Sequence, residues 1–114
     1  MTTALTPVTV NRRATTEAAQ AAEAAQAAQE TTRRLEQLRE RARSAGAAED
    51  ATPWLRHRAG RLEAATATAQ QLAQAATAAS TAAQHADGRH LAEIVDTAQR
   101  ARRDIYAMYL AITA

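Results

Sequence analysis

The stretch LEAATATAQQLAQAATAASTAAQHA, residues 62–86, contains the pattern that decides the fold. Uncharged residues recur in it at alternating intervals of three and four, at Leu62, Ala65, Ala69, Leu72, Ala76, Ala79, Ala83 and Ala86. This heptad spacing places one continuous stripe along a helix. Alanine dominates the stripe, so helix backbones can approach closely although little apolar surface is buried. Leu72 is the only large stripe residue after Ala65, and we expect its truncation to destabilise this helix most.

The same spacing continues on both sides of this stretch. Upstream, the stripe consists of Ala21, Ala24, Ala28, Thr31, Leu35, Leu38, Ala42 and Ala45. Downstream, it consists of Leu91, Ile94, Ala98, Ala101, Ile105, Met108 and Ile112. Short connections between helices make neighbours antiparallel. The predicted fold class is therefore all-α, with three long antiparallel helices in an alanine-rich, coiled-coil-like bundle.

The N-terminus breaks this pattern. Residues 6–10 combine β-branched side chains with Pro7, and proline disfavours helical backbone at the residue before it. We therefore predict an extended N-terminal arm over residues 1–13 and one three-helix bundle domain over residues 14–114. The arm is expected to dock on a neighbouring subunit.

Turn and capping residues set the expected helix limits. The first helix is expected to begin between Asn11 and Thr16 and to end near Ala45, with Gly46 as a left-handed residue after its last turn. Thr52 and Pro53 are a strong start signal for the second helix, which should reach about His85. Asp87 can cap a third helix from about Arg89 to Ile112.

Composition predicts a thin core. Alanine supplies 34 of the 114 residues, and without alanine and Met1 only 18 strongly apolar or aromatic residues remain. An alanine methyl contributes about 0.8 kcal/mol on burial, against roughly 2–3 kcal/mol for Leu or Ile. A lone chain is thus expected to be marginally stable, and a homo-oligomer or a protein partner is predicted.

The third helix should be about two turns too short to cover the end of the first helical hairpin. We name that end the tip, residues 39–61. Trp54 and Leu55 lie on it and are candidates for a protein contact. Its arginines are candidates for a contact with phosphate or an acidic surface, or form an ordinary solvated face with local ion pairs. These arginines are Arg39, Arg41, Arg43, Arg56, Arg58 and Arg61.

Half of the 18 large apolar residues lie in the third helix. Tyr106, Tyr109 and Leu110 widen its apolar face beyond the heptad stripe. Two interpretations follow: the third helix is central and buried by the other two, or it carries an outward stripe for self-association.

No residue pattern predicts catalysis, a cofactor or a bound metal. His85, Asp87, His90 and Glu93 lie close together in the chain, but the i, i+4 histidine pair typical of a helical metal site is missing. No apolar run reaches the roughly 18–20 residues of a membrane span, and the N-terminus lacks the pattern of a Sec signal peptide. The expected location is the cytoplasm or an assembled particle.

An alanine-, glutamine- and threonine-rich helical hairpin without cysteine, with Trp54 next to its turn, resembles the small type VII secretion substrates of the Trp-x-Gly family over residues 14–86. The sequence departs from that family in three ways. Trp54 is followed by Leu55 and Arg56 instead of x-Gly, Tyr106 is followed four residues later by Leu110 instead of an acid, and a third long helix is present. No function is carried over from this resemblance.

The function that these patterns favour is a non-catalytic structural or assembly protein, a subunit of a larger complex such as a phage, capsid-associated or secretion-type assembly. The alternative is a small accessory nucleic-acid-binding or regulatory module that uses the arginine-rich tip. Nucleic acid has weaker support because the formal net charge is only +2.

Overall fold

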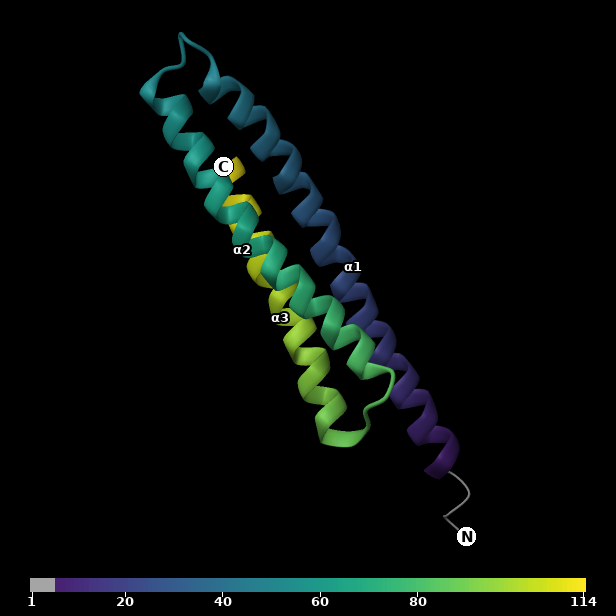
Figure 1. Ribbon diagram of the computed structural model, residues 1–114. Helices are drawn as coiled ribbons and strands as arrows, with labels where there is room; N and C mark the ends of the chain where they lie inside the picture. The colour runs from purple at the N-terminus through teal and green to yellow at the C-terminus, as the bar shows by residue number, and fades with distance from the viewer. Residues whose placement is uncertain (1–5) are drawn as a thin grey trace.

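The computed structural model describes residues 6–114, and its side chains from residue 16 onward. These residues form three α-helices: α1 over Thr6–Ala47, α2 over Pro53–Ala83 and α3 over Gly88–Thr113. Each helix packs against the other two, and neighbours along the chain run antiparallel, so α1 and α3 point the same way (Figure 1). The predicted all-α class and three-helix architecture are confirmed.

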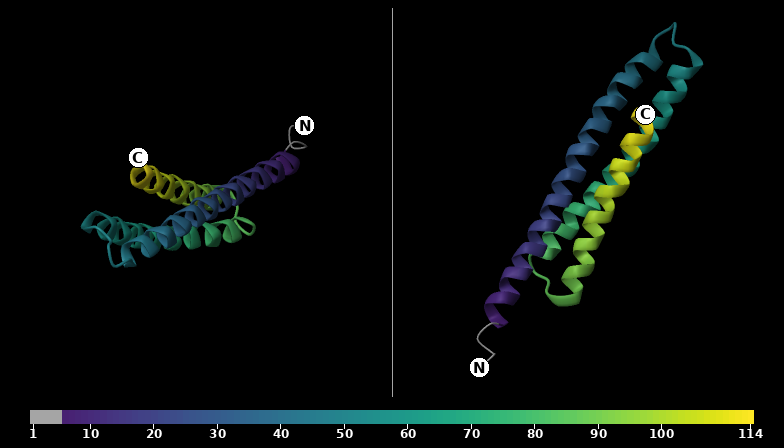
Figure 2. Two further views of the ribbon diagram at one scale, coloured as in Figure 1. Left: turned by 90° about the horizontal axis from the view of Figure 1, so that it is seen from above. Right: turned by 180° about the vertical axis from the view of Figure 1, so that it is seen from behind.

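The bundle is a rod that measures 77 × 22 × 16 Å. Its helices are staggered (Figure 1): the tip extends past the C-terminal end of α3, and the N-terminal part of α1 extends past the α2–α3 turn. Figure 2 shows α3 on one side of the α1–α2 hairpin, along both helices. The overhanging tip predicted from the helix lengths is therefore present.

The prediction of an extended backbone over residues 1–13 is wrong for residues 6–13. α1 begins at Thr6, so this part of the arm is helical. Pro7 lies in the first turn of α1, where a backbone N–H has no partner within the helix and its loss costs nothing. Residues 1–5 of the predicted arm lie outside the described residues.

The start of α2 follows the sequence signal. The Thr52 side chain accepts a hydrogen bond from the Leu55 backbone N–H at 3.3 Å, and Pro53 occupies the first helical position. The start of α3 is different, because Asp87 stands at the N-cap without a side-chain capping bond. Gly88 takes a φ of +55° there, which a residue with a side chain rarely adopts.

The prediction that Gly46 ends the first helix in a left-handed conformation is wrong. α1 continues to Ala47, and Gly88 is the one glycine with positive φ in the described chain. A Cβ atom built on Gly46 would lie 3.3 Å from the Ala59 Cβ and 3.6 Å from the Leu55 carbonyl oxygen in α2. The absence of a side chain at Gly46 therefore allows α1 to approach α2 closely within the tip.

The core has two parts. The tip-side core contains the fully buried Leu35, Leu62 and Ile105, one from each helix, with half-buried Leu38, Leu72, Met108, Tyr109 and Ile112 packed against it. The turn-side core, next to the α2–α3 turn, buries alanines of all three helices against Leu91 and Val95. These alanines are Ala21, Ala24, Ala79, Ala83 and Ala98. The close-packed alanine seam sealed by α3 is thus present.

The heptad stripe departs from the predicted frame in the middle of α2. Ala65 and Leu72 are only half-buried, whereas Thr66 and Ala73 are buried. A helix that packs against two neighbours buries a wider face than a two-helix stripe, and the centre of that face lies one residue further along. The buried Thr66 hydroxyl donates a hydrogen bond to the Leu35 carbonyl of α1 at 3.4 Å.

Candidate interaction surface

The large apolar residues that remain exposed gather in the tip half of the rod. Trp54 is 66% exposed, Tyr106 50% and Leu110 47%. The other two candidate contact residues, Leu55 and Tyr109, are half-buried. The Tyr109 ring stacks on the Tyr106 ring with 6.5 Å between centroids and packs against the tip-side core. Of the two interpretations of this part of α3, the core edge fits Tyr109, whereas Tyr106 and Leu110 face solvent.

The last turns of α3, residues 105–114, contain no charged residue. We name this segment the α3 end. Its inward side carries the buried Ile105 and the half-buried Met108, Tyr109 and Ile112. Its outward side carries apolar residues too, all exposed: Tyr106, Ala107, Leu110, Ala111 and Ala114. A helix on the surface of a soluble protein normally has polar residues on the outward side, so the α3 end has the composition of a covered helix.

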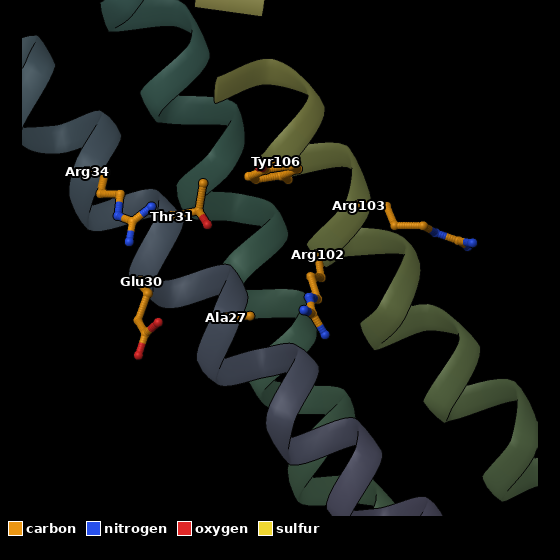
Figure 3. Close-up of a pocket in the computed structure, with 7 residues that line it drawn as sticks. All are labelled: Ala27, Glu30, Thr31, Arg34, Arg102, Arg103 and Tyr106. Atoms are coloured by element: carbon orange, nitrogen blue, oxygen red, sulfur yellow. The ribbon is translucent and has the colours of Figure 1, made fainter. Parts of the chain in front are cut away.

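A groove runs between α1 and α3 beside Tyr106, with a cavity of about 240 Å³. Figure 3 shows the Tyr106 ring turned toward Thr31 of α1, and Arg102 lying in the groove toward Ala27. Glu30 and Arg34 border it from the outer side of α1, while Arg103 points away from it. The groove is thus lined by an aromatic ring and by charges of both signs.

A second groove lies between α2 and the α3 end. It is lined by Trp54, His57, Arg58, Arg61 and residues 111–114, and encloses about 530 Å³. The Arg58 guanidinium lies over the Trp54 ring, 5.9 Å from its centroid, which is the geometry of a cation–π contact. The α3 end therefore has an aromatic residue on either side, Tyr106 toward α1 and Trp54 toward α2.

The six candidate arginines of the tip do not act as one group. Arg43 donates hydrogen bonds from Nε to Glu63 of α2 at 2.8 Å and from Nη1 to Glu40 at 2.9 Å, and forms a second bond to Glu63 through Nη2. The hydrogen bond and the charge of Glu63 raise the pKa of Arg43. Arg43 thus links α1 to α2 in an ion-pair network, and its pair with Glu40 is one of the local ion pairs of a solvated face that the sequence allowed.

The other five arginines differ in exposure. Arg39 is half-buried, and its buried Nε has no hydrogen-bond partner. Arg58 is half-buried on Trp54, whereas Arg41, Arg56 and Arg61 are exposed. The bridge from Arg43 to Glu63 has no local sequence signal, because Glu63 lies 20 residues away on another helix.

The histidines lie apart from any group of ligands. His57 lines the second groove, while His85 and His90 are exposed at the α2–α3 turn. In the part of the chain that the structure describes, no cluster of three or more His, Cys, Asp or Glu side chains could hold a metal ion. Within residues 6–114, no helix combines the length and apolar character that a membrane span needs.

The sequence predicted Trp54 on the uncovered tip, where it is exposed, but left open whether Tyr106 and Leu110 face the core or the solvent. It did not identify Glu30 and Arg34 as residues that line the α1–α3 groove together with Tyr106. Comparisons of the chain with known protein families, with curated proteins and with solved structures find no match.

Proposed function

We propose that this chain is a non-catalytic assembly subunit and that the α3 end, residues 105–114, contacts a partner protein in the complex. The observation that carries this proposal is the outward side of the α3 end, where Tyr106 and Leu110 are about half exposed on a helix segment without charge. Covering them would remove apolar surface from water, which contributes about 25 cal/mol per Å².

The residues around the α3 end support the same function. Tyrosine, tryptophan and arginine are the residues most enriched at the energetic centres of protein interfaces. Tyr106 and Trp54 flank the α3 end, and Arg58 holds the Trp54 ring from one side. A partner that covers the α3 end would bury Tyr106 within the contact and Trp54 at its edge.

The thin core gives the contact a second role. The turn-side core relies on alanine, so this half of the rod gains little from burial within one chain. Association adds stability to whichever folded form binds, in proportion to the logarithm of partner concentration. We therefore expect the assembled form to be more stable than the free chain.

A double substitution tests the proposal. Tyr106→Glu with Leu110→Glu places two charges on the outward side of the α3 end, and should abolish association while keeping the helical circular dichroism signal. The matched control is Ala92→Glu with Gln99→Glu, two exposed positions of α3 outside the α3 end. Association that persists in the first variant, measured by sedimentation, would contradict the proposal.

The alternative, an accessory nucleic-acid-binding or regulatory module, rests on the exposed Arg41, Arg56 and Arg61 of the tip. It is weakened because Arg43 is engaged by Glu40 and Glu63. Binding to random duplex DNA that falls steeply with salt, and that is lost on Arg56→Gln with Arg61→Gln, would favour it over the assembly function.

A further inference from the structure

One side of α1 carries four charges in a symmetric order. Glu23, Glu30, Arg34 and Arg41 are all exposed. Glu23 and Glu30 are seven residues apart, and so are Arg34 and Arg41. Residues seven apart lie two helical turns from each other on nearly the same face. Figure 3 shows Glu30 and Arg34 on the same side of α1, beside the α1–α3 groove.

These four side chains have no ion-pair partner among the side chains of residues 16–114. Glu30 and Arg34 are even i, i+4 neighbours, a spacing at which opposite charges can pair within a helix, yet no such pair is formed. Both charge signs are therefore available to an external partner along one line on the rod.

The order of the charges is complementary to itself when reversed. An identical helix laid antiparallel, with its centre at residue 32, places Arg41 opposite Glu23 and Arg34 opposite Glu30. Each of these two pairs then occurs twice across the contact. A parallel copy would instead place Glu opposite Glu and Arg opposite Arg, and like charges in register oppose association.

We propose that the partner of this surface is a second copy of the chain, packed antiparallel about a twofold axis at the level of residue 32 along α1, with Arg34 and Arg41 of each copy paired with Glu30 and Glu23 of the other. This inference rests on the proposed assembly function and adds the identity and orientation of the partner. A contact with twofold symmetry uses the same patch on both subunits, as the reversed charge order requires.

The apolar residues fit the same axis. Tyr106 borders the groove at the level of Thr31 and Arg34 of α1, close to the centre of the charge pattern. The twofold axis therefore brings the Tyr106 rings of both copies near each other, with Leu110 one turn further along α3. The contact then has an apolar centre and paired charges toward its ends, which is the usual arrangement in a stable interface.

Two complementary variants test the pairing. The first, Glu23→Arg with Glu30→Arg, makes all four positions basic, and the second, Arg34→Glu with Arg41→Glu, makes all four acidic. Each variant alone should dissociate, with its dimer dissociation constant raised about tenfold or more. An equal mixture should restore a complex of wild-type mass, because every basic position then faces an acidic one.

Circular dichroism of each variant shows whether the chain still folds, and a charge-matched control separates local from global electrostatics. The control, Glu93→Arg with Asp104→Arg, changes the net charge as much as the first variant, at exposed positions on the side of α3 away from α1. It should associate like the wild type. Variants that dissociate but do not reassemble on mixing would overturn the second copy as partner.

A spin label reports the orientation. The chain has no cysteine, so Ser44→Cys provides a single labelling site at an exposed position of α1. In the antiparallel dimer, the two labels are 24 residues apart along the helix direction, or about 36 Å. A short distance would mean a parallel pair and would overturn the inference. A monomeric wild type, or an assembling wild type whose charge variants associate unchanged, refutes this inference, whereas association that survives Tyr106→Glu with Leu110→Glu refutes the proposed function itself.

Discussion

The two halves of the rod achieve helix packing in different ways. The tip-side core places one large side chain from each helix, Leu35, Leu62 and Ile105, at full burial. The turn-side core packs alanines such as Ala21 and Ala98 so closely that each is inaccessible to solvent. Large side chains contribute more transfer free energy, while alanine lets the backbones approach closely and leaves no room for added atoms.

The exposed apolar residues follow the same division. Trp54, Tyr106 and Leu110 all lie in the tip half, although that half already holds the larger core. The turn half has no large hydrophobic residue exposed among the described side chains. The tip half therefore holds both the larger core and the apolar surface that stays in contact with solvent, and this is the surface that the proposed assembly function would cover.

Removing a large side chain from the tip-side core should have the largest effect. Leu62→Ala deletes a side chain with no exposed surface between α1 and α3, and should cost about 2–5 kcal/mol of unfolding free energy. Leu72→Ala, at a half-buried position of the same helix, should cost less. Urea denaturation of both variants measures the difference. A larger loss for Leu72 would restore the original heptad frame.

Adding atoms to the turn-side core should be the next largest effect. Ala21→Leu inserts a side chain where the alanine is fully buried, and overpacking should cost about 1–3 kcal/mol. Its neighbour Ala22 is exposed on the same helix, so Ala22→Leu should change stability by less than about 0.5 kcal/mol. Equal melting temperatures for these two variants would show that the alanine seam is loosely packed.

The two helical glycines should give the smallest effects. Gly60 is exposed in the interior of α2 with no atom within 4 Å of an added Cβ, so Gly60→Ala should stabilise by about 0.5–1 kcal/mol. Gly46→Ala brings a Cβ to 3.3 Å from Ala59, so the same gain in helix propensity should be reduced or reversed. Thermal denaturation compares the two variants, and a larger gain at Gly46 would exclude the close approach of α1 and α2.

Much of the fold could be predicted because its signals are local. The Thr52–Pro53 start of α2 and the heptad stripe of α3 depend only on residues within a turn or two of each other. The predictions that failed concern Gly46 and the Leu72 frame, and the outcome at each of these positions depends on a neighbouring helix. A glycine can end a helix or allow another backbone to approach closely. The sequence around Gly46 is compatible with both roles.

The prediction that α1 begins between Asn11 and Thr16 was also wrong. Pro7 and the β-branched residues around it have low intrinsic helix propensity, yet the helix begins at Thr6. Of the candidate site, the exposure of Trp54 was predictable from its place on the overhanging tip. The exposure of Tyr106 and Leu110 was not, because Val95 and Tyr109 also lie outside the stripe and are buried and half-buried. The α1–α3 groove was not predictable, because the rotation of α3 about its axis is set by packing against both other helices.

We propose that a second copy of the chain covers the α3 end. Sedimentation of the unmodified protein over about a hundredfold range of concentration tests it most directly. We expect a mass of at least twice the 12.2 kDa of one chain at the higher concentrations, with dissociation and a lower melting temperature on dilution. A single species of 12.2 kDa with a constant melting temperature across the whole range would contradict it.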